Sequence, residues 1–328
     1  MAERRRRRTT HLVSAALGVG AVAVVVATRR DALDAIETIS PAQFALVFAL
    51  TLVGHWLNAL EFHRINRALG AHRLGVSENW MLFCSGQLVN HLPAQAGTLY
   101  RFRYMKKVHG LDYPTAAVGH GLNFALTVLA TGLVGSAALV TLAVGGGGTS
   151  AALAIGFGSL AVVGVAAALA PLPSSRGDGR LARVWNRFVA GWRSVREQPQ
   201  VGAGVVGLEV AKYLVAALRL QLVFGWVGVD ESYAFFLVLA AVAGLATFVA
   251  ITPAAIGFRE FGLSGAAVAL GRGFDDGLVA ATLDRAVLLV AVVVMGTIGM
   301  IVTTMRMNGS VSPTLAAPPP VGRRLPQG

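Results

Sequence analysis

Three charged residues inside one apolar stretch carry the clearest chemical signal of the sequence. Glu209, Lys212 and Arg219 are separated by three and seven residues, which places them on one face of a helix. A charged side chain at the centre of a bilayer costs roughly 2.5 to 3.5 kcal/mol on insertion scales, so such residues pair or face a cavity. We expect Glu209 to pair with Lys212. The stripe then either lines a headgroup path with Arg219 on phosphate, or is a structural ion pair beside an arginine that extends to the membrane interface.

Two matching motifs interrupt the apolar runs. Pro93-Ala-Gln-Ala-Gly97 precedes Arg101, and Pro253-Ala-Ala-Ile-Gly257 precedes Arg259 and Glu260. Proline lacks an N–H and disrupts a helix, so the freed backbone groups must be buried in protein or line a wet cavity. Each motif has the same order around it: apolar run, break, charge, glycine turn, long helix. This order indicates an internal repeat, whose alternative is two ordinary proline kinks.

Arginines near these breaks are candidates for binding phosphate, because guanidinium donates bidentate hydrogen bonds without losing its charge. We nominate Arg101, Arg259 and Arg285 for this role, with Glu260 and Glu209 balancing charge or coupling to protons. Arg285 directly follows Asp284 in the chain. Adjacent residues point in different directions on a helix, so we expect the partner of Arg285 to come from another helix.

Polar residues at helical spacing form two further stripes: His55, Asn58 and Glu61, and later His120 and Asn123. Such stripes hold membrane helices together through hydrogen bonds, which is the favoured interpretation. The alternative is that either stripe borders the same cavity as the arginines.

The chain resembles the membrane domain of the lysylphosphatidylglycerol synthase and flippase-like family. The resemblance spans about residues 40 to 305 and rests on Asn90-His-Leu-Pro93-x-x-x-Gly97-x-x-x-Arg101, Pro253-x-x-x-Gly257-x-Arg259-Glu260 and Asp284-Arg285. It implies a stand-alone membrane domain that moves or handles lipids with modified headgroups or sugars. The family pattern usually has Glu-Arg and then Asp in the helix after the first break. This chain has Gly119-His120 and Asn123 there, which weakens a charged role for that helix.

Composition agrees with a membrane protein. Hydrophobic residues make up 55% of the 328 residues and charged residues 13%, against about 25% charged in a soluble domain. The net charge of +12 does not indicate nucleic-acid binding here, because the basic residues lie between apolar runs, as the positive-inside rule requires. The lone cysteine, Cys84, excludes an intramolecular disulfide.

The predicted fold is an all-α polytopic membrane protein with six to eight transmembrane helices and two re-entrant or broken segments. A basic cytoplasmic N-terminus (1–11) precedes a membrane domain (12–306) with repeat halves at 41–143 and 201–305, and 307–328 form a disordered tail. Basic flanks place both termini in the cytoplasm and make 80–92 a re-entrant hairpin, while 232–271 starts and ends outside. The predicted spans are 12–27, 42–60, 115–143, 150–170, 201–227 and 278–304.

The enzyme motifs that such a membrane protein could carry are incomplete or missing in this sequence. Gly262-Leu-Ser264-Gly265 is similar to the serine motif of rhomboid proteases, but no histidine follows His120 to activate the serine. Metal, phosphate-loop and dinucleotide motifs are missing from the sequence, so we expect no cofactor.

The leading hypothesis is a flippase-like transporter in the cell membrane that handles an anionic phospholipid or a polyprenyl-phosphate-linked glycolipid. Its two broken segments would flank a central cavity. The alternatives are a membrane enzyme or accessory subunit of lipid-linked glycosyl transfer, and a structural assembly partner. Expected partners are anionic membrane lipids and a membrane-associated glycosyltransferase or lipid-modifying enzyme. The sequence leaves the oligomeric state open.

Overall fold

A computed structural model describes residues 39–91, 96–246, 255 and 257–309. Within these ranges the chain forms ten α-helices and no β-strand, which confirms the predicted all-α class. The predicted helix at 12–27, residues 310–328 of the predicted tail, and both prolines of the break motifs, Pro93 and Pro253, lie outside the described residues. The first three residues of the predicted tail, 307–309, are helical instead and end the last long helix.

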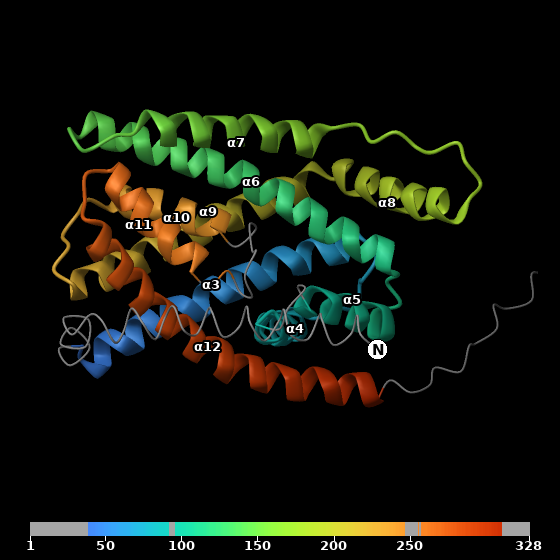
Figure 1. Cartoon of the computed structure of the whole chain (residues 1–328). Coiled ribbons are helices and arrows are strands. Elements are labelled where there is room, and N and C mark those ends of the chain that lie inside the picture. The colour runs from blue at the N-terminus through green and yellow to red at the C-terminus, as the bar shows by residue number, and fades with distance from the viewer. Residues whose placement is uncertain (1–38, 92–95, 247–254, 256, 310–328) are drawn as a thin grey trace, which may run out of the picture.

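Five helices are long and apolar enough to cross a membrane, which confirms a polytopic membrane protein. They are α3 (Pro41–Ala68), α6 (Tyr113–Val144), α7 (Ala151–Leu169), α9 (Pro199–Trp226) and α12 (Phe274–Gly309). At about 1.5 Å per residue even the shortest extends roughly 28 Å, the thickness of the hydrocarbon core. In Figure 1, α3, α7 and α12 run from left to right and α6 and α9 from right to left. Successive long helices therefore alternate in direction, as successive membrane crossings require.

Shorter helices form two hairpins between the long ones. One consists of α4 (Val76–Val89) and α5 (Ala96–His109), the other of α10 (Tyr233–Ala246) and α11 (Phe258–Ala269). With 12 to 14 residues each, these helices extend only about 21 Å and cannot span. A salt bridge joins the two ends of each hairpin: Glu78 pairs with His109 at 3.0 Å, and Glu231 pairs with Arg272. Both features fit the re-entrant segments, which stay a prediction.

The order long, short, short, long occurs twice, as α3–α4–α5–α6 and as α9–α10–α11–α12. The packing is reciprocal, since α4 lies against α12, α10 lies against α6, and α3 lies against α9. Corresponding long helices run in opposite directions in Figure 1. This order is the one expected for inverted halves at 41–143 and 201–305, a division that stays a prediction.

Glycines allow the closest helix contacts. Gly296 and Gly299 bring α12 onto the α4 backbone at Cys84 and Met81, and Gly132 and Gly164 bring α6 and α7 together. Small residues play this part in membranes because lipid leaves no hydrophobic force to drive helices together. Away from α6, α7 exposes apolar side chains, as a lipid-facing helix does.

In the chain, the amphipathic helix α8 (Arg180–Arg196) lies between the two halves. Its apolar side buries Val189, Trp192 and Val195. Its polar side carries arginines and no acidic residue. These arginines are Arg180, Arg183, Arg187, Arg193 and Arg196.

Candidate functional site

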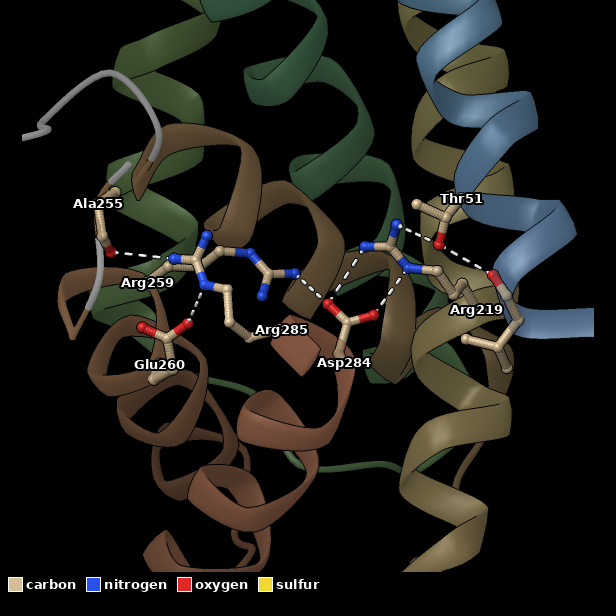
Figure 2. Close-up of polar contacts among 8 residues, drawn as sticks. Thr51, Arg219, Ala255, Arg259, Glu260, Asp284 and Arg285 are labelled. Carbon is tan, nitrogen blue, oxygen red and sulfur yellow. Dashed lines mark hydrogen bonds and ion pairs between the residues drawn. The ribbon is translucent and has the colours of Figure 1, made fainter. Parts of the chain in front are cut away.

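Asp284 on α12 joins two arginines from other helices (Figure 2). The Asp284 side chain is 0% exposed, and its carboxylate oxygens lie 2.7 Å from Arg219 Nε on α9 and 2.6 Å from Arg259 Nη2 on α11. Arg219 Nη1 also donates a hydrogen bond to Thr51 on α3 at 3.4 Å. Charge-assisted hydrogen bonds of this kind are about twice as strong as neutral ones. One carboxylate therefore holds α9, α11 and α12 together.

The neighbouring Arg285 points to a different partner, as expected. Its Nε lies 2.7 Å from Glu260 Oε1 on α11, and its Nη2 donates to the Ala255 carbonyl at 3.2 Å. The second Glu260 oxygen accepts the backbone N–H of Gly257 at 2.7 Å and so caps α11. The prediction that the partner of Arg285 comes from another helix is confirmed. Figure 2 shows Arg259 and Arg285 near Ala255 of the second break.

Together these residues form the arginine cluster, defined as Arg219, Arg259, Arg285, Asp284 and Glu260. Three guanidinium groups meet two carboxylates, so the cluster carries one positive charge in excess. Arg259 Nη1 is buried and has no hydrogen-bond partner in the described residues. Next to the cluster lies His91, which follows α4 at the first break and is close enough to Arg285 for electrostatic interaction. His91, at the edge of the first break, thus lies near a residue of the arginine cluster.

The expected single stripe on α9 divides into two sites. Lys212 Nζ lies 2.7 Å from Glu209, which confirms that pair, and 3.3 Å from Glu61 on α3. Arg219 belongs instead to the arginine cluster. The physical reason is distance: seven residues correspond to about 10 Å along a helix, too far for one ion-pair network. We call Glu61, Glu209 and Lys212 the carboxylate triad.

Arg101 on α5 occupies a third place. Its guanidinium lies over the Phe62 ring, 4.7 Å from the ring centre, and donates to Thr98 at 3.5 Å, while its Nη1 is buried without a partner. In the described residues no carboxylate forms an ion pair with it. A small cavity adjoins this side chain, with about 20 Å³ open to the centre of a water molecule, and lined by Phe62, Asn66, Asn79, Leu82, Phe83, Arg101, Phe102, Met105, Ala116 and His120. Arg259 and Glu260 are not in its lining.

The two glycines of the break motifs serve different needs. Gly97 is the second residue of α5 and packs against the Gly86 carbonyl and the Asn90 side chain. Gly257 precedes α11 with a φ of 82°, a left-handed conformation that favours glycine. Asn90 Nδ2 donates to Gln87 at 3.3 Å.

Residues 12–296 match the family model described as the lysylphosphatidylglycerol synthase TM region. The chain belongs to this family. The resemblance to this family is thereby confirmed, and the protein is a multi-pass membrane protein related to lipid handling. No curated protein matches the chain.

Where this chain departs from the usual family pattern, the structure shows what replaces it. Asn123 on α6 donates a hydrogen bond to Glu61 at 3.3 Å, so its position still takes part in a charged site. His120, one turn earlier, lines the cavity at Arg101. The Ser264 hydroxyl is buried and donates to the Glu260 carbonyl, which is a packing role.

Two residues were not nominated from the sequence as binding residues: Asp284 and Glu61. Both were visible as polar residues in apolar helices, and a buried acid in such a helix is a signal of function. Their partners come from other helices, which helical spacing does not predict.

Glu78 forms a separate site at the base of the first hairpin. Its carboxylate accepts from His109 at 3.0 Å and Tyr104 at 2.6 Å, and pairs with Arg306 of α12 at 2.9 Å. Burial raises the pKa of Glu78, but the hydrogen bonds from His109 and Tyr104 outweigh burial and lower the pKa to about 2.

This lowered pKa predicts a pH-dependent stability. A carboxyl whose pKa is lower in the folded protein contributes stability above its usual value of 4.5 and loses it as pH falls to about 2. We expect the melting temperature of the wild type in detergent to fall through this window more steeply than that of Glu78→Gln. At neutral pH Glu78→Gln should be less stable by roughly 1.5 to 3 kcal/mol. Parallel curves for Glu78→Gln and wild type, with Glu197→Gln as the exposed control, would contradict the assignment.

Proposed function

We propose that this protein moves a lipid with an anionic headgroup between the leaflets of the cell membrane. The observation that carries the proposal is the positive excess of the arginine cluster, three guanidinium groups against two carboxylates, buried among apolar helices. An unbalanced charge in a low-dielectric interior costs several kcal/mol. A phosphate group bound at the cluster would neutralise it.

Guanidinium chemistry supports phosphate as the ligand. Planar N–H donors match phosphate oxygens in pairs, and Arg259 Nη1 is a buried donor with no partner in the described residues. Arg219 and Arg285 each keep 11% of the side chain exposed, which leaves the cluster open to a ligand. Arg101, unlike the cluster arginines, has no carboxylate partner in the described residues and would provide a second phosphate contact on the path. The cavity beside it must widen before a headgroup enters.

The orientation we propose follows the distribution of charge. The basic helix α8, the end of α5 and the end of α12 lie at the right of Figure 1, and the α9–α10 loop with Asp230 and Glu231 lies at the left. By the positive-inside rule we propose that the right side, with the end of α12, faces the cytoplasm. With the predicted helix at 12–27 as a further crossing, the N-terminus lies on the same side. The substrate class is a phospholipid or a polyprenyl-phosphate-linked glycolipid. A membrane-associated glycosyltransferase or lipid-modifying enzyme that supplies or receives it is the proposed partner.

Leaflet exchange in liposomes tests the proposal. We expect the purified full chain to exchange a labelled anionic lipid, and Arg259→Gln to reduce the rate at least about tenfold, since a hydrogen bond to a charged group contributes roughly 1.5 to 3 kcal/mol. Glutamine keeps a donor for Asp284 while removing the charge. The control is Arg187→Gln, because Arg187 is 64% exposed and pairs with Asp112 at the surface. It should exchange lipid as the wild type does.

Three results would contradict transport by this cluster. The first is equal exchange by wild type and a folded Arg259→Gln, and the second is equal exchange of anionic and zwitterionic lipids. The third is product formation from a lipid-linked sugar without any exchange, which would favour a membrane enzyme.

A further inference from the structure

The carboxylate triad contains more negative than positive charge. Glu61 and Glu209 are both 0% exposed, and the single ammonium of Lys212 lies 3.3 Å from the first and 2.7 Å from the second. If both carboxyl groups were ionised, the triad would carry one uncompensated negative charge among apolar helices. Burying such a charge is costly, and a bound proton removes it.

Hydrogen-bond geometry locates that proton. The Thr127 hydroxyl on α6 lies 2.9 Å from the Asn123 carbonyl, the bond that threonine commonly makes within a helix, and also contacts Glu209 Oε1. A hydroxyl has one hydrogen and the carbonyl can only accept. When Thr127 donates to Asn123, the remaining contact requires Glu209 Oε1 to be the donor, and a carboxyl oxygen donates only when it is protonated.

One turn further along α6 and α9, a second threonine makes the same two contacts, but its partner on α9 is a tyrosine, which always carries a hydroxyl hydrogen. Thr131 donates to the Thr127 carbonyl at 2.8 Å and contacts the hydroxyl of Tyr213 on α9. Tyr213 follows Glu209 by four residues, as Thr131 follows Thr127, so the two pairs are equivalent contacts between α6 and α9. Tyrosine carries its own hydrogen and donates it. By this equivalence Glu209 has the role of Tyr213, that of the hydrogen-bond donor to the threonine hydroxyl.

Glu61 has the surroundings of an ionised carboxylate. Its Oε2 accepts hydrogen bonds from Lys212 and from Asn123 Nδ2, each at 3.3 Å. Two donors on one oxygen, one of them charged, favour the anionic form. The charge of Glu61 then balances that of Lys212. The shorter contact of Lys212, 2.7 Å to Glu209 Oε2, joins the ammonium to the unprotonated oxygen of the Glu209 carboxyl group.

We propose that Glu209 binds one proton on Oε1, with Glu61 as the ionised partner of Lys212, so that the triad is a proton-binding site. The ligand of this site is a proton, and Lys212, with 20% of its side chain exposed, is its most exposed member. Release of the proton would leave a net negative charge in the bilayer. Proton binding is therefore linked to any conformational change that alters the exposure of Lys212.

Other ionisable groups on the surrounding helices are engaged elsewhere. On α3, His55 packs against Phe83, and Arg64 reaches Gly204 at the start of α9. Further along α9, Arg219 pairs with Asp284 of α12. No other charged side chain in the described residues forms an ion pair with the triad. Further ionisable groups on these helices are His63 and Arg67 on α3, Tyr113 and His120 on α6, Tyr213 on α9, Tyr233 at the start of α10, Asp275, Asp276, Arg285 and Arg306 on α12, and Arg180, Arg183, Arg187, Arg193 and Arg196 on α8.

Infrared difference spectroscopy of the full chain in lipid tests the site directly. A protonated carboxyl group gives a carbonyl stretching band that shifts in D₂O, and an ionised one does not. We expect this band in the wild type and its loss in Glu209→Gln. Glu61→Gln should lose it as well, because Glu209 is then the only carboxyl group beside Lys212 and must ionise to balance its charge. Glutamine keeps the N–H donor toward Thr127, so Glu209→Gln should fold. The matched control is Glu260→Gln, because Glu260 is buried but paired with Arg285, and it should keep the band.

Absence of the band in the wild type, or its persistence in Glu209→Gln or in Glu61→Gln, would overturn the proposal. A second variant keeps the test informative if Glu209→Gln does not fold. Thr127→Val removes the acceptor of the Glu209 proton, so the band should move to higher frequency, and an unmoved band would count against the site. The readout is a carboxyl vibration and not lipid movement, so its outcome is independent of the proposed transport.

Discussion

Replacement of Asp284 by alanine is expected to destabilise the protein by about 3 to 5 kcal/mol, the usual effect of removing one partner from a buried ion pair. Asp284 is 0% exposed and is the carboxylate that lies between Arg219 and Arg259. Without it, two guanidinium groups face each other at the junction of α9, α11 and α12. We expect a large fall in melting temperature in detergent, or loss of monodisperse protein.

Two comparisons make this result specific. Asp178→Ala, at an exposed position between α7 and α8, should leave the melting temperature unchanged. The double variant Asp284→Ala/Arg219→Gln should be less destabilised than the sum of the two single variants, because it removes one of the two charges left unpaired. If Asp284→Ala melts like Asp178→Ala, the buried cluster does not hold these helices together.

Gly97→Ala is expected to produce the second large effect, a loss of roughly 3 kcal/mol, at the upper end of the usual cost of overpacking. A methyl group at Gly97 would overlap the Gly86 carbonyl oxygen and lie 2.5 Å from Asn90 Oδ1. Backbone cannot rotate away as a flexible side chain can, so α4 and α5 would have to separate. The melting temperature should fall, and the movement of the hairpin should also lower leaflet exchange through displacement of Arg101.

A matched control is available on α3. Gly54 lies within a helix and a methyl group there would meet nothing within 4 Å, so Gly54→Ala should be neutral or slightly stabilising. A Gly97→Ala variant as stable as Gly54→Ala would show that α4 and α5 are not in close contact.

Several features of this protein could be predicted from the sequence because they depend on local order in the chain. The five described spans follow from the length of apolar runs, since the bilayer thickness sets how many residues a crossing needs. The first hairpin follows from an apolar run too short to cross, and the second from the count of crossings, which requires 232–271 to start and end on the same side. The pairing of Glu209 with Lys212 follows from their spacing of three residues on one helix.

Contacts between helices were decided by the tertiary structure. Spacing predicted that Arg219 shares a stripe with Glu209, but its partner is Asp284, sixty-five residues further along the chain. Lys212 likewise gains Glu61 from α3, and Arg101 rests on Phe62. The glycine that ends each break motif has a different role in the two copies. Gly97 avoids overlap with a neighbouring backbone, and Gly257 permits a left-handed turn. Each outcome depends on how one helix is rotated and shifted against another. Periodicity within a single helix shows which face is polar, and only packing determines what that face meets.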